Sequence, residues 1–256
     1  MRRFLMASLV AGVLSAPAFA AEITPFELYR TGKYEAAIAA GEAANTGPDL
    51  ATAARAAFAE ANLSETPCLS CLKRVEVLAR RSILLDRTRP EAYVYLAAAV
   101  GYQARIVGNL RAQLSHIPEQ AKEALDRALV VGPNDDWALA ATGAWHIEVV
   151  RNGGTMLARA VYGAEIDTGL DYFARAFAAE PKNLVIRFQY ALSLSGYDFS
   201  TYAKEVTDAL AAVATIEPRT VYEGAIKERA ARLLALIKAN KRSEYLALVS
   251  RYQGYG

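Results

Sequence analysis

The stretch Asn134–Pro181 decides the fold and reads NDDWALAATGAWHIEVVRNGG, then TMLARAVYGAEIDT, then GLDYFARAFAAEP. Its first and last parts, Asp135–Val150 and Gly169–Pro181, are rich in alanine and other residues that favour helix. Small residues stand where two helices must approach closely, and Pro181 ends the second segment because proline cannot continue a helix. The irregular residues Arg151–Gly154 break the pattern between them. The stretch predicts two antiparallel helices that form one unit of a repeat array.

The same pattern recurs along the chain, in segments 24–48, 49–86, 91–133 and 184–218. In the first of them the marker residues are Gly32, Tyr34, Ala37, Ala44 and Pro48. This spacing resembles the tetratricopeptide repeat, in which glycine makes the turn, alanines allow close helix packing and proline ends the unit. The resemblance implies an all-α, right-handed TPR-like solenoid of about five helix pairs, with a C-terminal capping helix at 219–239. We expect a last helix at 241–252 and frayed residues at 253–256.

Two neighbouring units are longer than the family's repeat of about 34 residues, by roughly a dozen residues each. The additions lie between the helices of each unit, at Arg105–Ser115 and Arg151–Thr168. Insertions in a solenoid map to one face, so these two segments are expected to lie near one another.

The unit at residues 134–181 also resembles the helical-repeat domain of the regulator of microtubule dynamics proteins. The likeness rests on Gly143 and Trp145, the connection Met156–Ala160, Phe173 with Ala176, and Pro181. In that family the domain is an adaptor, so the resemblance implies a binding role.

The first twenty residues are interpreted as a cleaved signal peptide. Arg2 and Arg3 precede a short apolar run, Phe4–Leu14, and Ser15–Ala20 ends in an A-x-A cleavage pattern. The paired arginines leave the twin-arginine route open as an alternative to ordinary secretion. The run is shorter than the roughly 20 residues that span a bilayer, and no later run is long enough. We therefore expect a single mature domain, residues 21–256, exported to the periplasm.

Charge balance excludes nucleic acid as a partner. The chain has 29 Lys and Arg and 27 Asp and Glu residues, and the leader holds two of the basic ones and none of the acidic ones. The mature chain is therefore neutral, whereas nucleic-acid affinity depends on clustered basic residues.

The two cysteines, Cys68 and Cys71, are expected to form a local disulfide in an oxidising compartment. A redox-active C-x-x-C pair is the alternative, although no thioredoxin-like pattern surrounds it. A zinc site is the remaining alternative and needs two further ligands.

No catalytic motif is present: the chain lacks G-x-S-x-G, H-E-x-x-H, a phosphate-binding loop and a dinucleotide fingerprint. With two histidines in the chain, His-dependent triads are nearly excluded. We therefore expect a protein that is not an enzyme and holds no cofactor and no metal.

The candidate binding groove comprises Tyr102, Arg105, Arg111, Trp145, His146, Glu148 and Arg151. At ordinary repeat spacing Tyr102 and Glu148 face the concave side, and the arginines at 105 and 151 lie one turn further along. Such arginines bind carboxylates through paired hydrogen bonds, and tyrosine supplies rigid apolar area. Solvated helix ends are the alternative for the charged residues. For Trp145 the alternative is packing in the core. For His146 the alternative is a partly buried histidine whose hydrogen bonds are satisfied by a neighbouring side chain.

These observations predict an exported scaffold or adaptor that binds another protein or a peptide in the periplasm. The first alternative is a small-ligand-binding accessory protein of a transport or envelope-biogenesis system, with a pocket roofed by the insertions. The second is a thiol-active protein that uses Cys68 and Cys71.

Overall fold

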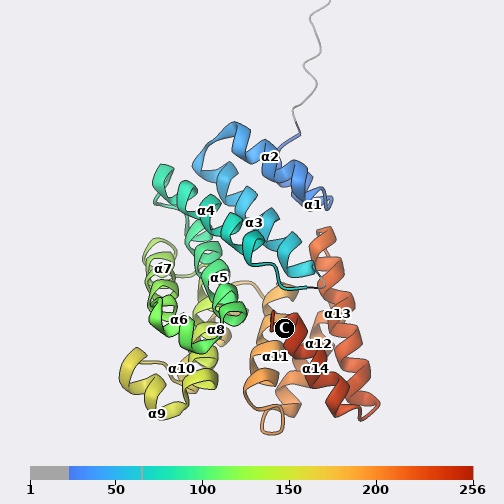
Figure 1. The fold of residues 1–256 in the computed structure, drawn as a ribbon. Coiled ribbons are helices and arrows are strands. Elements are labelled where there is room, and N and C mark those ends of the chain that lie inside the picture. The colour runs from blue at the N-terminus through green and yellow to red at the C-terminus, as the bar shows by residue number, and fades with distance from the viewer. Residues whose placement is uncertain (1–22, 65, 256) are drawn as a thin grey trace, which may run out of the picture.

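A computed structural model of the chain describes residues 23–64 and 66–255. The predicted signal peptide, residues 1–20, lies outside these ranges. Within them the protein is all-α, and no strand occurs (Figure 1). No helix of this part of the chain combines the length and the apolar character that crossing a membrane requires.

The helices follow one another along the whole described chain. They are α1 (Pro25–Arg30), α2 (Tyr34–Ala44), α3 (Gly47–Leu63), α4 (Leu69–Leu85), α5 (Pro90–Val107), α6 (Asn109–Leu114), α7 (Ile117–Val131), α8 (Asp136–Gly153), α9 (Thr155–Leu157), the π-helical turn η1 (Ala158–Tyr162), α10 (Ile166–Ala179), α11 (Leu184–Asp198), α12 (Ala203–Thr215), α13 (Val221–Lys238) and α14 (Arg242–Tyr252).

Side-chain caps fix several of the helix starts. Thr46 accepts a hydrogen bond from the Asp49 backbone N–H at α3, and Asp135 accepts one from Ala138 at α8. Asn183 accepts from the two backbone N–H groups that follow at α11. Each cap satisfies N–H groups that the first helical turn leaves without a partner. The positions at which these helices begin are therefore set by capping residues just before each apolar segment.

The helices pack in sequential pairs: α1 with α2, α3 with α4, α5 with α7, α8 with α10, α11 with α12, and α13 with α14. The first helices of successive pairs also pack on one another, from α1 through α3, α5, α8 and α11 to α13. They form a continuous inner row. The last helix, α14, packs on α11 as well as on α13, and the C-terminus lies near the middle of the molecule (Figure 1). At one crossing, a Cβ on Gly143 of α8 would lie 2.8 Å from the Gly169 carbonyl oxygen of α10. Glycine is required there by the close approach of the two backbones.

The two ends of the inner row meet. Asn62 of α3 accepts a hydrogen bond from the Tyr222 hydroxyl of α13 (3.1 Å), and Arg229 of α13 donates to the Asn62 main-chain oxygen (3.0 Å). Near the start of α13, Val221 lies against Gly32, in the turn between α1 and α2. The array therefore curls until its last pair touches its first two, and the concave side becomes an interior.

The insertions are more regular than the sequence indicates. Helix α8 continues to Gly153, so the expected irregular break at Arg151–Gly154 is wrong except for its last residue, where a positive φ of 74° ends the helix. The first insertion extends α5 to Val107 and then forms α6, and the second forms α9 and η1. Their starts touch through an Asn109–Asn152 hydrogen bond of 3.4 Å.

Cys68 and Cys71 form a disulfide with a Cα–Cα distance of 5.2 Å. Cys68 is also the N-cap of α4, where its sulfur accepts a hydrogen bond from the Cys71 backbone N–H. The bond lies at the turn between α3 and α4. The disulfide links the N-cap of α4 to the first turn of the same helix and so restrains the end of the α3–α4 connection.

Candidate functional site

A cavity of about 240 Å³ lies on the concave side, between the inner helices. Its volume exceeds the ~150 Å³ that holds a benzene molecule and is just below the ~300 Å³ at which drug-sized pockets begin. Aromatic side chains from six helices line it, among them Phe58, Tyr95, Trp137, Trp145, Phe188, Tyr222 and Tyr252. Alanines of α5 and α8 line much of the rest. The small residues leave the space open, and the curl of the array brings helices from its two ends to the walls of the cavity.

Charge is confined to one end of this cavity. Among the described residues that line it, only Arg105 and Glu148 are charged. Arg105 comes from the last turn of α5 and donates from Nε to the Glu148 Oε1 of α8 at 3.2 Å. Its guanidinium also lies over the Tyr102 ring, 4.4 Å from the centroid. The Arg105 side chain is 9% exposed, so this ion pair is largely shielded from water.

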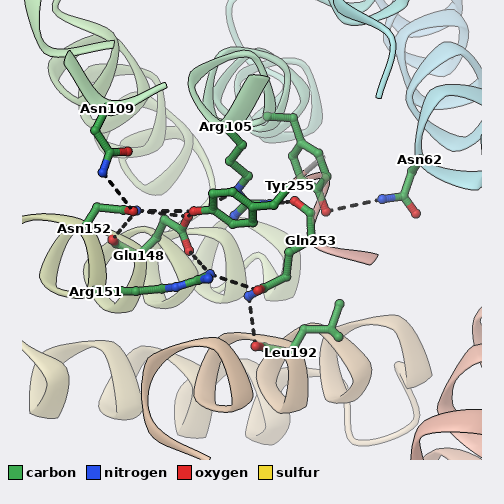
Figure 2. A network of polar contacts seen from close by, with 10 residues as sticks. Asn62, Arg105, Asn109, Glu148, Arg151, Asn152, Leu192, Gln253 and Tyr255 are labelled. Carbon is green, nitrogen blue, oxygen red and sulfur yellow. Dashed lines mark hydrogen bonds and ion pairs between the residues drawn. The ribbon is translucent and has the colours of Figure 1, made fainter. Parts of the chain in front are cut away.

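Residues 253–255 cover the charged end. Figure 2 shows Gln253 between Arg105 and Arg151. Arg105 Nη1 donates to the Gln253 main-chain oxygen at 2.6 Å, and Arg151 Nη1 donates to its Oε1 at 2.9 Å. Gln253 Nε2 donates in turn to the Leu192 carbonyl of α11 at 3.0 Å. The expectation that this segment is frayed is therefore wrong for 253–255: Gln253 is 1% exposed, and the Arg105 and Arg151 guanidinium groups hold both of its oxygens.

The next two residues continue the cover. Gly254 has a φ of +82° and lies against Tyr102, where a Cβ would be 2.9 Å from the ring. The Tyr255 hydroxyl donates to Glu148 Oε1, and its ring lies 4.6 Å from the Arg151 guanidinium. Asn152 also donates to Glu148, at 3.2 Å (Figure 2). The segment thus closes the cavity with neutral groups.

The electrostatics of this end hold its groups in their charged forms. Burial would raise the pKa of Glu148, but Arg105, the Tyr255 hydroxyl and Arg151 together lower it below its usual value. Burial would lower the pKa of Arg105, and the neighbouring carboxylate and tyrosines raise it instead. Two guanidinium groups therefore face one carboxylate, and both also donate to oxygens of the neutral residue Gln253.

The structure brings most of the predicted groove residues together. Tyr102, Arg105, Trp145 and Glu148 line the cavity. Arg151 lies behind Gln253 and contacts Glu148 at 3.7 Å. Sequence reasoning missed Asn62, Tyr222 and the segment 253–255. No motif distinguishes them, because each reaches the site only through the closure of the array.

Arg111 and His146 do not line the cavity. Arg111 is exposed on α6, on the outside of the first insertion. His146 points toward α10, where its ring stacks on Tyr172 with 5.7 Å between centroids and its Nδ1 accepts a hydrogen bond from the Glu165 backbone N–H. Trp145, its neighbour, does reach the cavity and donates from Nε1 to the Pro118 carbonyl at 3.1 Å.

Burial, assisted by Lys122, lowers the pKa of His146 to about 4. Because this value lies below the ~6.5 of an unfolded histidine, His146 stabilises the fold fully above pH 6.5, and this contribution is lost as pH falls toward 4.

The free energy of unfolding of the parent should therefore fall between pH 7 and pH 4.5, and His146→Asn should reduce that fall by about 2 kcal/mol. Urea unfolding at both pH values measures it. His116→Gln is the control, because His116 is 76% exposed and should leave the difference unchanged. An unaltered difference in His146→Asn would contradict this account.

No protein-family model matches the chain, and no curated protein matches it either. Within the described residues, no group of three or more His, Cys, Asp or Glu side chains is placed to hold a metal ion. The candidate site therefore consists of the cavity, its charged end and the segment that covers it.

Proposed function

We propose that this protein binds a small, mainly apolar ligand in the cavity between its inner helices. The observation that carries the proposal is the cavity of about 240 Å³, lined mainly by aromatic and aliphatic residues and charged at one end only. An apolar pocket with a few placed polar groups is the usual form of a small-molecule site. Binding, without catalysis, is the role that this lining supports.

The proposal includes a fold and a location. We propose that residues 21–256 form one right-handed TPR-like solenoid, supported by the inner row of helices and the repeated spacing of small residues and prolines. We also propose that residues 1–20 direct export to the periplasm. A ligand binder there fits an accessory role in a transport or envelope-biogenesis system.

The adaptor function is the second candidate, and exposed apolar side chains on the insertions favour it. Leu110 and Leu114 of α6 are 71% and 74% exposed, and Met156 of α9 is 87% exposed. Leu110 and Leu114 lie about one turn apart on the same face of α6, and exposed apolar side chains on one face are typical of a surface that meets a partner. A partner protein would then bind the outside of the insertions, since residues 253–255 already occupy the charged end of the concave side.

The test is retention of a small molecule by the chain from Ala21 onward, purified from its native host and examined by native mass spectrometry. We expect a bound mass that denaturation releases. Ala144→Leu should abolish retention, because Ala144 lines the cavity and the larger side chain fills it. Ala231→Leu is the matched control, since Ala231 is exposed on α13. Loss of retention in both variants, or no bound mass in the parent, would refute ligand binding. A protein that co-purifies in place of a small molecule would favour the adaptor.

A further inference from the structure

We infer that the ligand is an amphiphile with an apolar body and one carboxylate, and that its headgroup competes with Gln253 for the hydrogen-bond donors of Arg105 and Arg151. The inference rests on the proposed ligand-binding function and adds the chemical class of the ligand. Three features of the site carry it: where the charge lies, how the charges balance, and what Gln253 contacts.

The distribution of charge along the cavity matches an amphiphile. Arg105 and Glu148 lie at one end, and the remaining lining is aromatic, aliphatic or uncharged polar. A fully apolar ligand would leave the charged end without a counterpart. A ligand charged at several points would bury charge against aromatic rings, which is costly without a partner. One ionic group attached to an apolar body fits both ends.

The sign of that ionic group follows from the numbers of positive and negative side chains at the charged end. Arg105 and Arg151 contact Glu148 at 3.2 Å and 3.7 Å, so two cations share one anion. Of the two, Arg105 is only 9% exposed and gains little compensation from solvent. An anionic headgroup neutralises the remaining positive charge, whereas a cationic one would add to it.

Gln253 shows where the headgroup binds. Its main-chain oxygen accepts from Arg105 and its amide oxygen accepts from Arg151, so two neutral oxygens of one residue bridge two guanidinium groups. Glu148 shows that the two oxygens of one carboxylate can reach both guanidinium groups, at 3.2 Å and 3.7 Å. Charge-assisted hydrogen bonds are about twice as strong as those to neutral acceptors. Gly196 leaves the space for this, because a Cβ there would lie 2.7 Å from both Arg151 and Gln253. A carboxylate therefore competes with Gln253 for the same donors.

The test uses decanoate as the probe, with decanol and decylamine as matched chains of different charge. Both tryptophans of the protein line the cavity, so intrinsic fluorescence reports binding below the critical micelle concentration. We expect decanoate to bind at least about tenfold more tightly than decanol and decylamine to bind most weakly. Arg151→Met should abolish the preference for decanoate and leave decanol affinity unchanged. Arg232→Met is the control, because Arg232 is exposed on α13.

A second variant gives a change of opposite sign. Gln253→Ala removes the amide oxygen that competes for Arg151, so decanoate affinity should rise severalfold while decanol affinity changes little. A fall in decanoate affinity would show that Gln253 does not hold the headgroup position and would overturn the inference. Equal binding of decanoate and decanol would also overturn it, yet would leave the proposed function standing. If none of the three probes binds and the native protein retains no small molecule, the proposed function fails as well.

Discussion

Replacing Arg105 with methionine is expected to lower the free energy of unfolding by about 3–5 kcal/mol. Methionine keeps the length of the apolar stem but removes the guanidinium, which holds Glu148, the Gln253 carbonyl and the Tyr102 ring. The loss is large because Glu148 would stay buried without its principal cation, and an uncompensated buried charge costs far more than an exposed ion pair contributes. Urea unfolding monitored by helical circular dichroism measures the effect.

Two comparisons separate this explanation from a simple loss of packing. The double variant Arg105→Met with Glu148→Met should recover much of the lost stability, because removing both charges removes the uncompensated one. In the parent, the lowered pKa of Glu148 provides stability above the unfolded value of ~4.3 that is lost as pH falls through the folded pKa. Without Arg105 that pKa rises, so the cost of the substitution should shrink between pH 7 and pH 5. An equal cost at both pH values would contradict the charge argument.

Phe173→Ala is expected to cost about 3–5 kcal/mol, the usual range for deleting a fully buried aromatic side chain. Phe173 of α10 has no exposed surface, and its ring lies 5.1 Å from that of Tyr190 on α11. It also fills the space beside Gly143, where a Cβ would lie 2.8 Å from the ring. The deletion would leave a cavity at the crossing of α8 and α10, where rigid backbones cannot collapse into it.

Phe177→Ala is the matched control, because Phe177 lies one turn later on the same helix and is only partly buried. Its cost should be clearly smaller. Chemical denaturation of both variants tests this, with the slope of the transition showing whether unfolding stays two-state. Phe173 does not line the ligand cavity, so the folded variant should still retain the small molecule. Equal losses in the free energy of unfolding for the two substitutions would contradict this account, because they would show that the crossing of α8 and α10 repacks around the deletion.

The sequence predicts the helix pairs well because each depends on local features. Small residues such as Gly143 and prolines such as Pro181 act within one or two turns, and caps such as Asp135 act over three residues. The meeting of Tyr102, Arg105, Glu148 and Arg151 also follows from local spacing, since these residues occupy equivalent turns on α5 and α8. Features that recur at fixed intervals along the chain can therefore be predicted from the sequence alone.

The meeting of the two ends of the array around the cavity could not be predicted in this way. It depends on how small rotations between successive pairs add up, and no single unit encodes their sum. Gln253 contacts Arg105, which lies 148 positions earlier in the chain, and nothing in the local pattern around Gln253 marks that contact. Arg111 was misplaced for a related reason, because the insertion folded into α6 with that side chain outside.

The contacts of Asn62 with Tyr222 and Arg229 have a consequence for how this protein folds. In an open repeat array each unit touches only its neighbours, so stability is nearly additive and end units can be removed one at a time. Here the second and the last units hold one another across more than 150 positions of sequence. Such contacts raise the mean sequence separation of the native pairings, which slows folding. They also make the array behave as a ring of interdependent units, in which loosening the last pair also loosens the pair of α3 and α4.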